Sequence, residues 1–363
     1  MSQVGIGIVG CGNISSAYLS AAKHFPILNI KALADINPEA AQSRGRQFGI
    51  PAVEIQSLLD DPEIEIVINL TVPQAHVDVG LKAVAAGKHV HSEKPLGISV
   101  AEASRLVEAA KAKGVRIGCA PDTFLGGAQQ TCRKLINDRA IGDVISGTAF
   151  FMCPGHEKWH PNPAFYYATG GGPVLDMAPY YLTSLVNLLG PVTRVTAMGS
   201  QLRQERTIES EPLKGRKIPV QVPTHVAGLL EFESGAIVTM VMSFDVVRHA
   251  HRPIELYGST GSLSVPDPDK FGDTIELTDK SGKWAPVATV FPYADGNYRI
   301  LGAADMALAI RTGQPHRASG ELAFHVLEVM EALDVSAGRG AHVGIKSSPA
   351  RPAAMPHNPD FGQ

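Results

Sequence analysis

The sequence predicts an α/β protein in two parts: a doubly wound parallel sheet, then an α+β part with an open-faced, mainly antiparallel sheet. Strand and helix patterns alternate over residues 1–120, as a parallel sheet with helical crossovers requires. From residue 144 to 277 strand patterns follow one another, separated mostly by turns, which indicates antiparallel pairing. The first apolar strand, residues 4–9, runs directly into a glycine turn that opens a helix.

Length and charge limit the function. A chain of 363 residues can bury two sizeable cores. The net charge of −3 and a pI near 6.5 give no electrostatic case for binding nucleic acids or acidic membranes. No apolar run is long enough to cross a bilayer, and no export signal precedes the first strand. The four cysteines lack C-x-x-C spacing and indicate reduced thiols, so we expect a cytoplasmic protein.

The glycine turn, Gly10-Cys11-Gly12-Asn13-Ile14-Ser15, is typical of a dinucleotide site. Backbone N–H groups at a helix start bind a pyrophosphate, and glycines let it approach. Asp35 ends the second strand, 23 residues after Gly12, where a carboxylate meets the adenine ribose. Ser15 replaces the third glycine of the usual dinucleotide-binding motif. The prediction of a dinucleotide site therefore depends on the order of strand, turn, helix, strand and acid. Asp35 also predicts NAD over NADP, because it would repel a 2′-phosphate.

The remaining elements follow in order. In the first part we expect strands at 64–70, 88–92 and 115–120, a helix at 77–86 ended by Gly87, and a helix opened by a Ser99/Glu102 capping box and ended by Gly114. The second part, 121–340, predicts strands at 144–151, 226–232, 236–244, 254–257 and 274–277, and helices at 129–137, 175–189, 298–311 and 321–333. We expect an exposed loop at 204–217 and an irregular tail at 341–363.

Two further segments carry chemistry. Glu93-Lys94-Pro95 follows the strand at 88–92, and ligands of such sheets bind outside the carboxyl ends of the strands, so Lys94 should emerge beside the dinucleotide. Pro95 restricts the lysine backbone to extended conformations and permits a cis bond. Asp176 and Tyr180 follow three glycines and share one helix face. The alternative is a core helix in which Tyr180 is only packed, because neighbouring leucines form an apolar stripe.

Together these motifs resemble the Gfo/Idh/MocA family of oxidoreductases over nearly the whole chain. The resemblance implies an N-terminal Rossmann domain that binds NAD, and a C-terminal sheet that forms a homodimer or homotetramer. It implies that residues of the glycine turn line the pyrophosphate, that Asp35 binds the ribose, and that the ends of the next strands border the cofactor. The cofactor residues it implies are Gly10, Gly12, Asn13, Ile14, Asp35, Thr71, Val72, His76, Glu93 and Lys94.

Two departures from the family pattern matter. Ala178 replaces a usual glycine, and Tyr180 replaces the usual histidine, as in the branch that resembles glucose–fructose oxidoreductase and dihydrodiol dehydrogenase. The Thr-Pro-x-x-x-His motif appears as residues 71–76 with its proline displaced by one position. We interpret His76 as a structural partner of its loop rather than as a proton carrier.

The resemblance implies NAD-dependent oxidation of a secondary hydroxyl on a cyclic sugar, glycoside or polyol, or reduction of the keto form. We expect Tyr180 to be the acid/base, with its pKa lowered by Lys94, and Asp176 to bind a substrate hydroxyl or orient the pair. Two alternatives stay open: oxidation and elimination by a glycosidase or lyase with retained NAD, and an NAD-sensing regulator without activity.

Residues 156–160 match H-E-x-x-H, which binds zinc only on a continuous helix. Flanking Pro154, Gly155, Pro161 and Pro163 oppose such a helix, so we expect no metal site there, nor at the histidines of 249–251. We expect an aromatic wall of the substrate pocket instead, formed by Trp159, His160, Phe165, Tyr166 and Tyr167.

Overall fold

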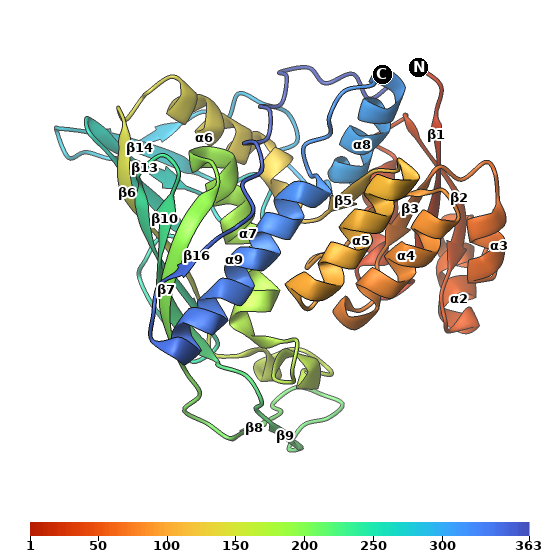
Figure 1. Ribbon diagram of the computed structural model, residues 1–363, viewed down its shortest axis with the longest axis horizontal. Helices are drawn as coiled ribbons and strands as arrows, with labels where there is room; N and C mark the ends of the chain where they lie inside the picture. The colour runs from red at the N-terminus through yellow and green to blue at the C-terminus, as the bar shows by residue number, and fades with distance from the viewer. Residues whose placement is uncertain (363) are drawn as a thin grey trace.

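In the computed structural model, which describes residues 1–362, two sheets lie side by side with helices between them (Figure 1). The first sheet is entirely parallel, in the order β2-β1-β3-β4-β5. Its strands are β1 (Val4–Val9), β2 (Leu28–Ala34), β3 (Ile66–Asn69), β4 (His89–Ser92) and β5 (Ile117–Cys119). β1 and β3 are buried along their whole length, because helices cover both faces. The predicted doubly wound sheet is confirmed.

Helices connect the successive strands of this sheet. They are α1 (Ser15–Ala22), α2 (Pro38–Phe48), α3 (Ile55–Asp60), α4 (His76–Ala85) and α5 (Val100–Lys113), with a short 3-10 turn η1 (Pro73–Ala75) before α4. The Ser99 side chain accepts a hydrogen bond from the Glu102 N–H at the start of α5. Gly114 ends the same helix in a left-handed conformation.

The second sheet has nine strands in the order β15-β14-β13-β12-β6-β11-β10-β7-β16. β6 pairs in parallel with β11, and all other neighbours are antiparallel, so the mainly antiparallel prediction is confirmed. The strands are β6 (Val144–Met152), β7 (Val192–Ser200), β10 (His225–Phe232), β11 (Ile237–Ser243), β12 (Ile254–Gly258), β13 (Gly261–Val265), β14 (Ile275–Asp279), β15 (Ala285–Val287) and β16 (Val343–Gly344).

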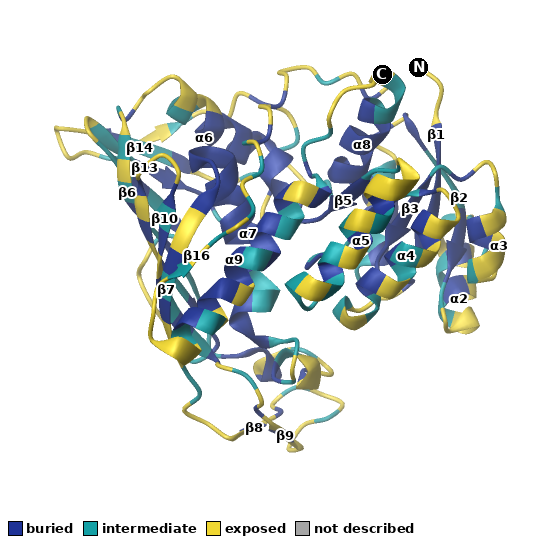
Figure 2. Ribbon diagram, viewed as in Figure 1, coloured by how far each residue is buried: buried dark blue, intermediate teal, exposed yellow. Residues whose placement is uncertain are grey.

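Two long helices, α7 (Gly172–Leu189) and α9 (Gly320–Arg339), pack on one face of this sheet and are largely buried (Figure 2). α9 also contacts α5 and β5, so it joins the two sheets. The other helices of this half are α6 (Gly127–Asn137), preceded by the 3-10 turn η2 (Thr123–Leu125), and α8 (Leu301–Thr312). α8 packs against β3 and β5 of the first sheet, although it belongs to the C-terminal half of the chain.

Of the two segments expected to be irregular, only 204–217 needs correction. The stretch 204–217 was expected to be an exposed loop, but its ends form the paired strands β8 (Glu205–Thr207) and β9 (Lys217–Pro219), and Arg206 is buried. After β16 the tail contains no further helix or strand among the described residues, yet it is packed against the body. Phe361 is fully buried against Phe25 with ring centroids 5.5 Å apart, and its carbonyl accepts the Ile27 N–H.

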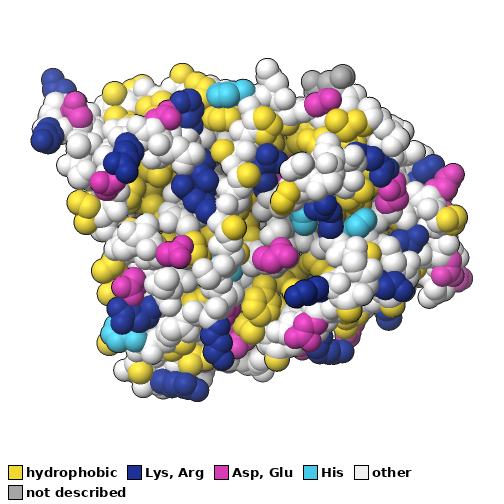
Figure 3. Space-filling model, turned by 45° about the horizontal axis from the view of Figure 1, so that its top comes forward, with side chains coloured by type: hydrophobic (Ala, Val, Ile, Leu, Met, Phe, Trp, Pro, Cys, Tyr) yellow, Lys and Arg dark blue, Asp and Glu magenta, His cyan; other side chains and the backbone are white. Residues whose placement is uncertain are grey.

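On the face seen in Figure 3, acidic and basic side chains are interspersed, with hydrophobic side chains between them. Within residues 1–362, no helix is both long and apolar enough to cross a membrane.

Candidate functional site

The glycine turn after β1 has the geometry that a pyrophosphate needs. Gly10 has a φ of +102°, and a Cβ there would lie 2.5 Å from the carbonyl carbon of Leu70, so only glycine fits. A Cβ at Gly12 would meet no protein atom within 4 Å, which leaves its outer side open to a ligand. Among the described residues, no acceptor lies within hydrogen-bond distance of the N–H groups of Asn13 and Ile14. Free N–H groups at a helix start are what an anion binds.

Asp35 lies directly beside this turn. Its Oδ2 accepts the Cys11 N–H at 2.7 Å and its Oδ1 accepts the Asn37 N–H at 2.8 Å. Each oxygen has a further lone pair, so the carboxylate can still accept two ribose hydroxyls. Arg44 on α2, which no sequence motif indicated, also lies beside the turn, and its guanidinium donates to the Gly12 carbonyl at 3.0 Å. The residues present therefore fit NAD.

The loops after β3 and β4 are tied together by His76. Its fully buried ring has Nδ1 2.7 Å from the Pro95 carbonyl and Nε2 3.0 Å from the Thr71 carbonyl. The Thr71 hydroxyl donates to the Asn69 side chain at 2.7 Å, and Val72 is exposed at the same edge. His76 is therefore the structural partner of its loop that the sequence predicted.

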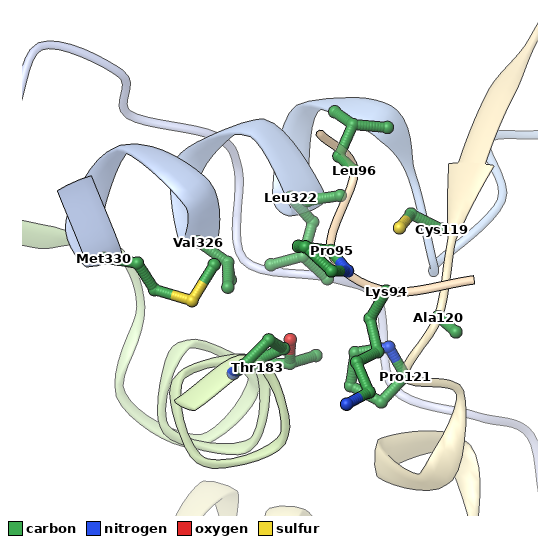
Figure 4. A pocket seen from close by; sticks show the side chains of 12 residues that line it. Lys94, Pro95, Leu96, Cys119, Ala120, Pro121, Thr183, Leu322, Val326 and Met330 are labelled. Atoms are coloured by element: carbon green, nitrogen blue, oxygen red, sulfur yellow. The ribbon is translucent and has the colours of Figure 1, made fainter. Parts of the chain in front are cut away.

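Lys94 emerges at the carboxyl end of β4, as predicted. Glu93 precedes it and is anchored, because its carboxylate accepts the Tyr18 hydroxyl at 2.8 Å and the Lys94 N–H at 3.0 Å. The Lys94–Pro95 bond is cis. Figure 4 shows Lys94 and Pro95 on a segment that passes between the α9 side chains Leu322, Val326 and Met330 and the Ala120–Pro121 segment after β5.

The Lys94 ammonium and the Asp176 carboxylate form an ion pair at the centre of the site, with side chains that are 15% and 17% exposed. Lys94 Nζ lies 2.9 Å from Asp176 Oδ1 and 2.5 Å from the Asp176 backbone oxygen. Burial alone would raise the pKa of Asp176, but Lys94 and His156 outweigh it and hold that pKa at about 2. Burial opposes the charge of Lys94, and Asp176 overcomes this to raise the lysine pKa. Both groups are therefore charged at neutral pH.

Tyr180 lies on the same helix face as Asp176, with its ring centroid 5.1 Å from Lys94 Nζ. The expectation that Lys94 lowers its pKa below the ordinary value is wrong. Burial raises the pKa of Tyr180 more than the nearby Lys94 charge lowers it, so the net shift is upward. Asp269 raises the same pKa and Arg299 lowers it. These two residues form an ion pair of 2.6 Å that no sequence motif indicated.

The loop between β6 and α7 supplies one wall of the site, and it brings in a residue that the sequence analysis missed. His156 Nε2 lies 3.0 Å from Asp176 Oδ2, and the Trp159 indole N–H donates to His156 Nδ1 at 3.2 Å. The Tyr166 ring packs on His156, and the two ring centroids are 4.3 Å apart. Burial and Asp176 raise the pKa of Tyr166 to about 12. The signal for His156 was present in the H-E-x-x-H match, but only its zinc interpretation was considered.

The structure brings together all but one of the residues of the predicted aromatic wall. His160 contacts Trp159 and Tyr166 by its ring, and Phe165 stacks on Tyr166. Tyr167, in contrast, is fully buried and donates its hydroxyl to Glu157, so its assignment to the pocket wall is wrong. The segment 156–158 is a single 3-10 turn, η3 (His156–Lys158), followed by another, η4 (Ala164–Tyr166), rather than a helix. Glu157 points inward and pairs with Arg206 at 2.8 Å.

Comparisons with known proteins agree with this geometry. Residues 4–120 match the family described as "Oxidoreductase family, NAD-binding Rossmann fold", and residues 129–264 match the "GFO/IDH/MocA C-terminal domain". The chain is 30% identical over 270 residues to dTDP-3,4-didehydro-2,6-dideoxy-alpha-D-glucose 3-reductase of Saccharopolyspora spinosa, covering 72% of this chain and 74% of that protein. It is 27% identical over 294 residues to levoglucosan dehydrogenase of Pseudarthrobacter phenanthrenivorans, covering 72% and 73%.

Myo-inositol 2-dehydrogenase of Thermotoga maritima is 24% identical over 323 residues, covering 87% of this chain and 91% of that protein. Among solved structures, levoglucosan dehydrogenase in complex with NADH superposes with a TM-score of 0.83 at 22% identity, over 95% of this chain and 100% of that one, which shows the shared fold. The chain belongs to the Gfo/Idh/MocA family of oxidoreductases, and its residues 4–120 form an NAD-binding Rossmann domain.

Proposed function

We propose that this protein oxidises a secondary hydroxyl of a cyclic sugar, glycoside or polyol with NAD, or reduces the corresponding keto form. The observation that carries the proposal is the Lys94–Asp176 ion pair beside Tyr180, at the edge of the sheet where Rossmann domains bind their ligands. The names of the relatives, which include levoglucosan dehydrogenase and myo-inositol 2-dehydrogenase, support a substrate of this class. When bound, NAD supplies the hydride acceptor at its nicotinamide C4.

The proposed roles follow from the contacts. An ammonium has three N–H groups, and Asp176 takes two of those of Lys94, so one remains for the reacting oxygen of the substrate. Its positive charge would stabilise negative charge that develops on that oxygen. The Tyr180 phenolate would take the substrate proton during oxidation, and the Tyr180 phenol would return it during reduction. Asp176 would keep Lys94 charged and in place, while Trp159, His160 and Tyr166 would pack on the C–H face of the sugar.

The direct test is to incubate the purified protein with NAD and a panel of sugars, glycosides and cyclitols and to follow NADH. Net NADH formation that is proportional to substrate consumed would support the proposal. Substrate consumption without any net NADH would contradict it and favour elimination by a retained cofactor. No turnover with the whole panel, in either direction and despite measured NAD binding, would also contradict the proposed substrate class.

We also propose that NAD is preferred over NADP because of Asp35. A 2′-phosphate beside this carboxylate should cost about 1–3 kcal/mol, which corresponds to roughly 5- to 150-fold in kcat/KM. Asp35→Ser is expected to lower the ratio of kcat/KM with NAD to kcat/KM with NADP. Glu39→Ser is the matched control, because it removes an exposed acid from the first turn of the nearby α2 and leaves Asp35 in place. A wild-type preference for NADP would overturn the assignment.

The free face of the nine-stranded sheet is proposed to pair with a second copy of the chain, as a homodimer or within a homotetramer. Leu229 and Ile237 are exposed on neighbouring strands β10 and β11, and Met198 on β7 is 82% exposed, on the face opposite α7 and α9. Met198→Glu is expected to shift the mass in solution toward the monomer, as measured by light scattering. A monomeric wild type would contradict the proposal.

A further inference from the structure

His156 is held at both ring nitrogens. Its Nε2 lies 3.0 Å from Asp176 Oδ2, and its Nδ1 lies 3.2 Å from the Trp159 indole nitrogen. The side chain is 9% exposed, and its ring packs against Tyr166 and Phe244 at centroid distances of 4.3 and 4.5 Å. It is therefore a fixed group of the site wall.

The two partners together determine which ring nitrogen carries the proton. An indole N–H can only donate, so the Nδ1 that it contacts must be an unprotonated acceptor. With Nδ1 unprotonated, the imidazole is neutral. Its single proton must be on Nε2, which donates it to the Asp176 carboxylate in a hydrogen bond. Asp176 thus accepts one bond on each oxygen, from Lys94 on Oδ1 and from His156 on Oδ2.

The backbone of His156 is fixed by a second, separate network. Its N–H donates to the Tyr167 hydroxyl at 3.1 Å, and that hydroxyl donates to Glu157. The Glu157 carboxylate accepts from Arg206, which also pairs with Asp245 on the segment after β11. This network of hydrogen bonds and ion pairs fixes the backbone position of His156 on the interior side. On the solvent side, Trp159, which is 61% exposed, determines which ring nitrogen carries the proton.

We propose that Trp159 holds His156 as the neutral Nε2–H tautomer, and that this imidazole is a positioning residue that fixes the Asp176 carboxylate and, through it, the Lys94 ammonium. The tautomer itself does not depend on the activity; its kinetic consequence rests on the proposed function. Small displacements of a catalytic group cost about 10²-fold in rate, so an unpositioned Asp176 should be costly. The bond also orients the exposed indole, whose face would then be presented to a sugar.

Nitrogen-15 NMR of the histidine rings, recorded on the full chain near neutral pH without substrate, tests the tautomer directly. We expect His156, identified by the signals that disappear in His156→Gln, to show a bare Nδ1 and a protonated Nε2. In Trp159→Phe, which keeps an aromatic ring but loses the indole N–H, we expect other protonation forms to appear. A wild-type His156 protonated at Nδ1, or an unchanged spectrum in Trp159→Phe, would overturn the proposal.

Kinetics then separate positioning from a purely structural role. His156→Leu removes the donor to Asp176 and should lower kcat about 10²-fold with little change in the KM for NAD. His156→Gln keeps an N–H donor near the Nε2 position and should recover most of that loss. His249→Leu, at an exposed histidine after β11, should match the wild type. Equal losses in the Leu and Gln variants would overturn the positioning role. If no panel compound is turned over, the proposed function fails while the NMR result still decides the tautomer.

Discussion

Lys94→Ala is expected to lower kcat by about 10²–10³-fold while the affinity for NAD changes little, since losing one electrostatic contact to the reacting oxygen typically costs this much. The ammonium is paired with Asp176 and beside Tyr180, which is where charge would develop on the substrate oxygen. Glycine-turn residues and Asp35 contribute the proposed NAD contacts and are not touched by this change. The measurement is kcat with the best substrate, together with an NAD dissociation constant from calorimetry.

The control for Lys94→Ala is Lys31→Ala, which removes a lysine from a surface ion pair with Glu63. It should change neither kcat nor the dissociation constant for NAD. Thermal unfolding of the Lys94 variant is needed, because removing one partner of a buried ion pair costs about 3–5 kcal/mol. Its remaining partner, Asp176, still faces His156 at 3.0 Å, which should limit that cost. If the folded variant kept most of its turnover, Lys94 would be a cofactor contact only.

Tyr180→Phe is expected to lower kcat by about 10²–10⁴-fold, the usual contribution of a general acid or base, while the protein stays folded. The phenylalanine ring preserves the packing of a side chain that is only 8% exposed, and it removes the single hydroxyl. Tyr181→Phe is the matched control on the same helix, because that hydroxyl donates to the Phe150 carbonyl at 3.1 Å, away from Lys94. A dead Tyr181→Phe beside an active Tyr180→Phe would contradict our assignment of this helix face.

The pH dependence should identify the same residue. Burial raises the pKa of Tyr180, so the phenol is the main form at neutral pH. Oxidation needs the phenolate as base, and its rate should therefore rise with pH through the neutral and mildly alkaline range, whereas reduction uses the phenol and should not. Asp176, with its pKa at about 2, does not titrate in this window. In Tyr180→Phe the rising limb should vanish; a limb that persists would assign the proton to another group.

The local parts of this protein were determined by the sequence itself. Gly10 is required because its φ is +102°, and Asp176 and Tyr180 share a face because they are four residues apart on a helix. The end of a parallel strand likewise determines which edge of the sheet Lys94 occupies. Each of these features depends on backbone geometry within a few residues, and that geometry is encoded in residue type and spacing.

Only the tertiary structure decided which distant groups meet. Lys94 and Asp176 are 82 residues apart and meet only in the folded chain, and the packing of remote segments also buries Tyr180, which raises the tyrosine pKa. Arg206 belongs to a charged stretch that the sequence predicts to be exposed, yet Arg206 is buried because it forms an ion pair with the buried Glu157. His156 meets Asp176 only because the loop folds back over α7. Periodicity sets the direction of a side chain along its own element, but the free energy of an ion pair or hydrogen bond depends on partners that the packing of remote segments supplies.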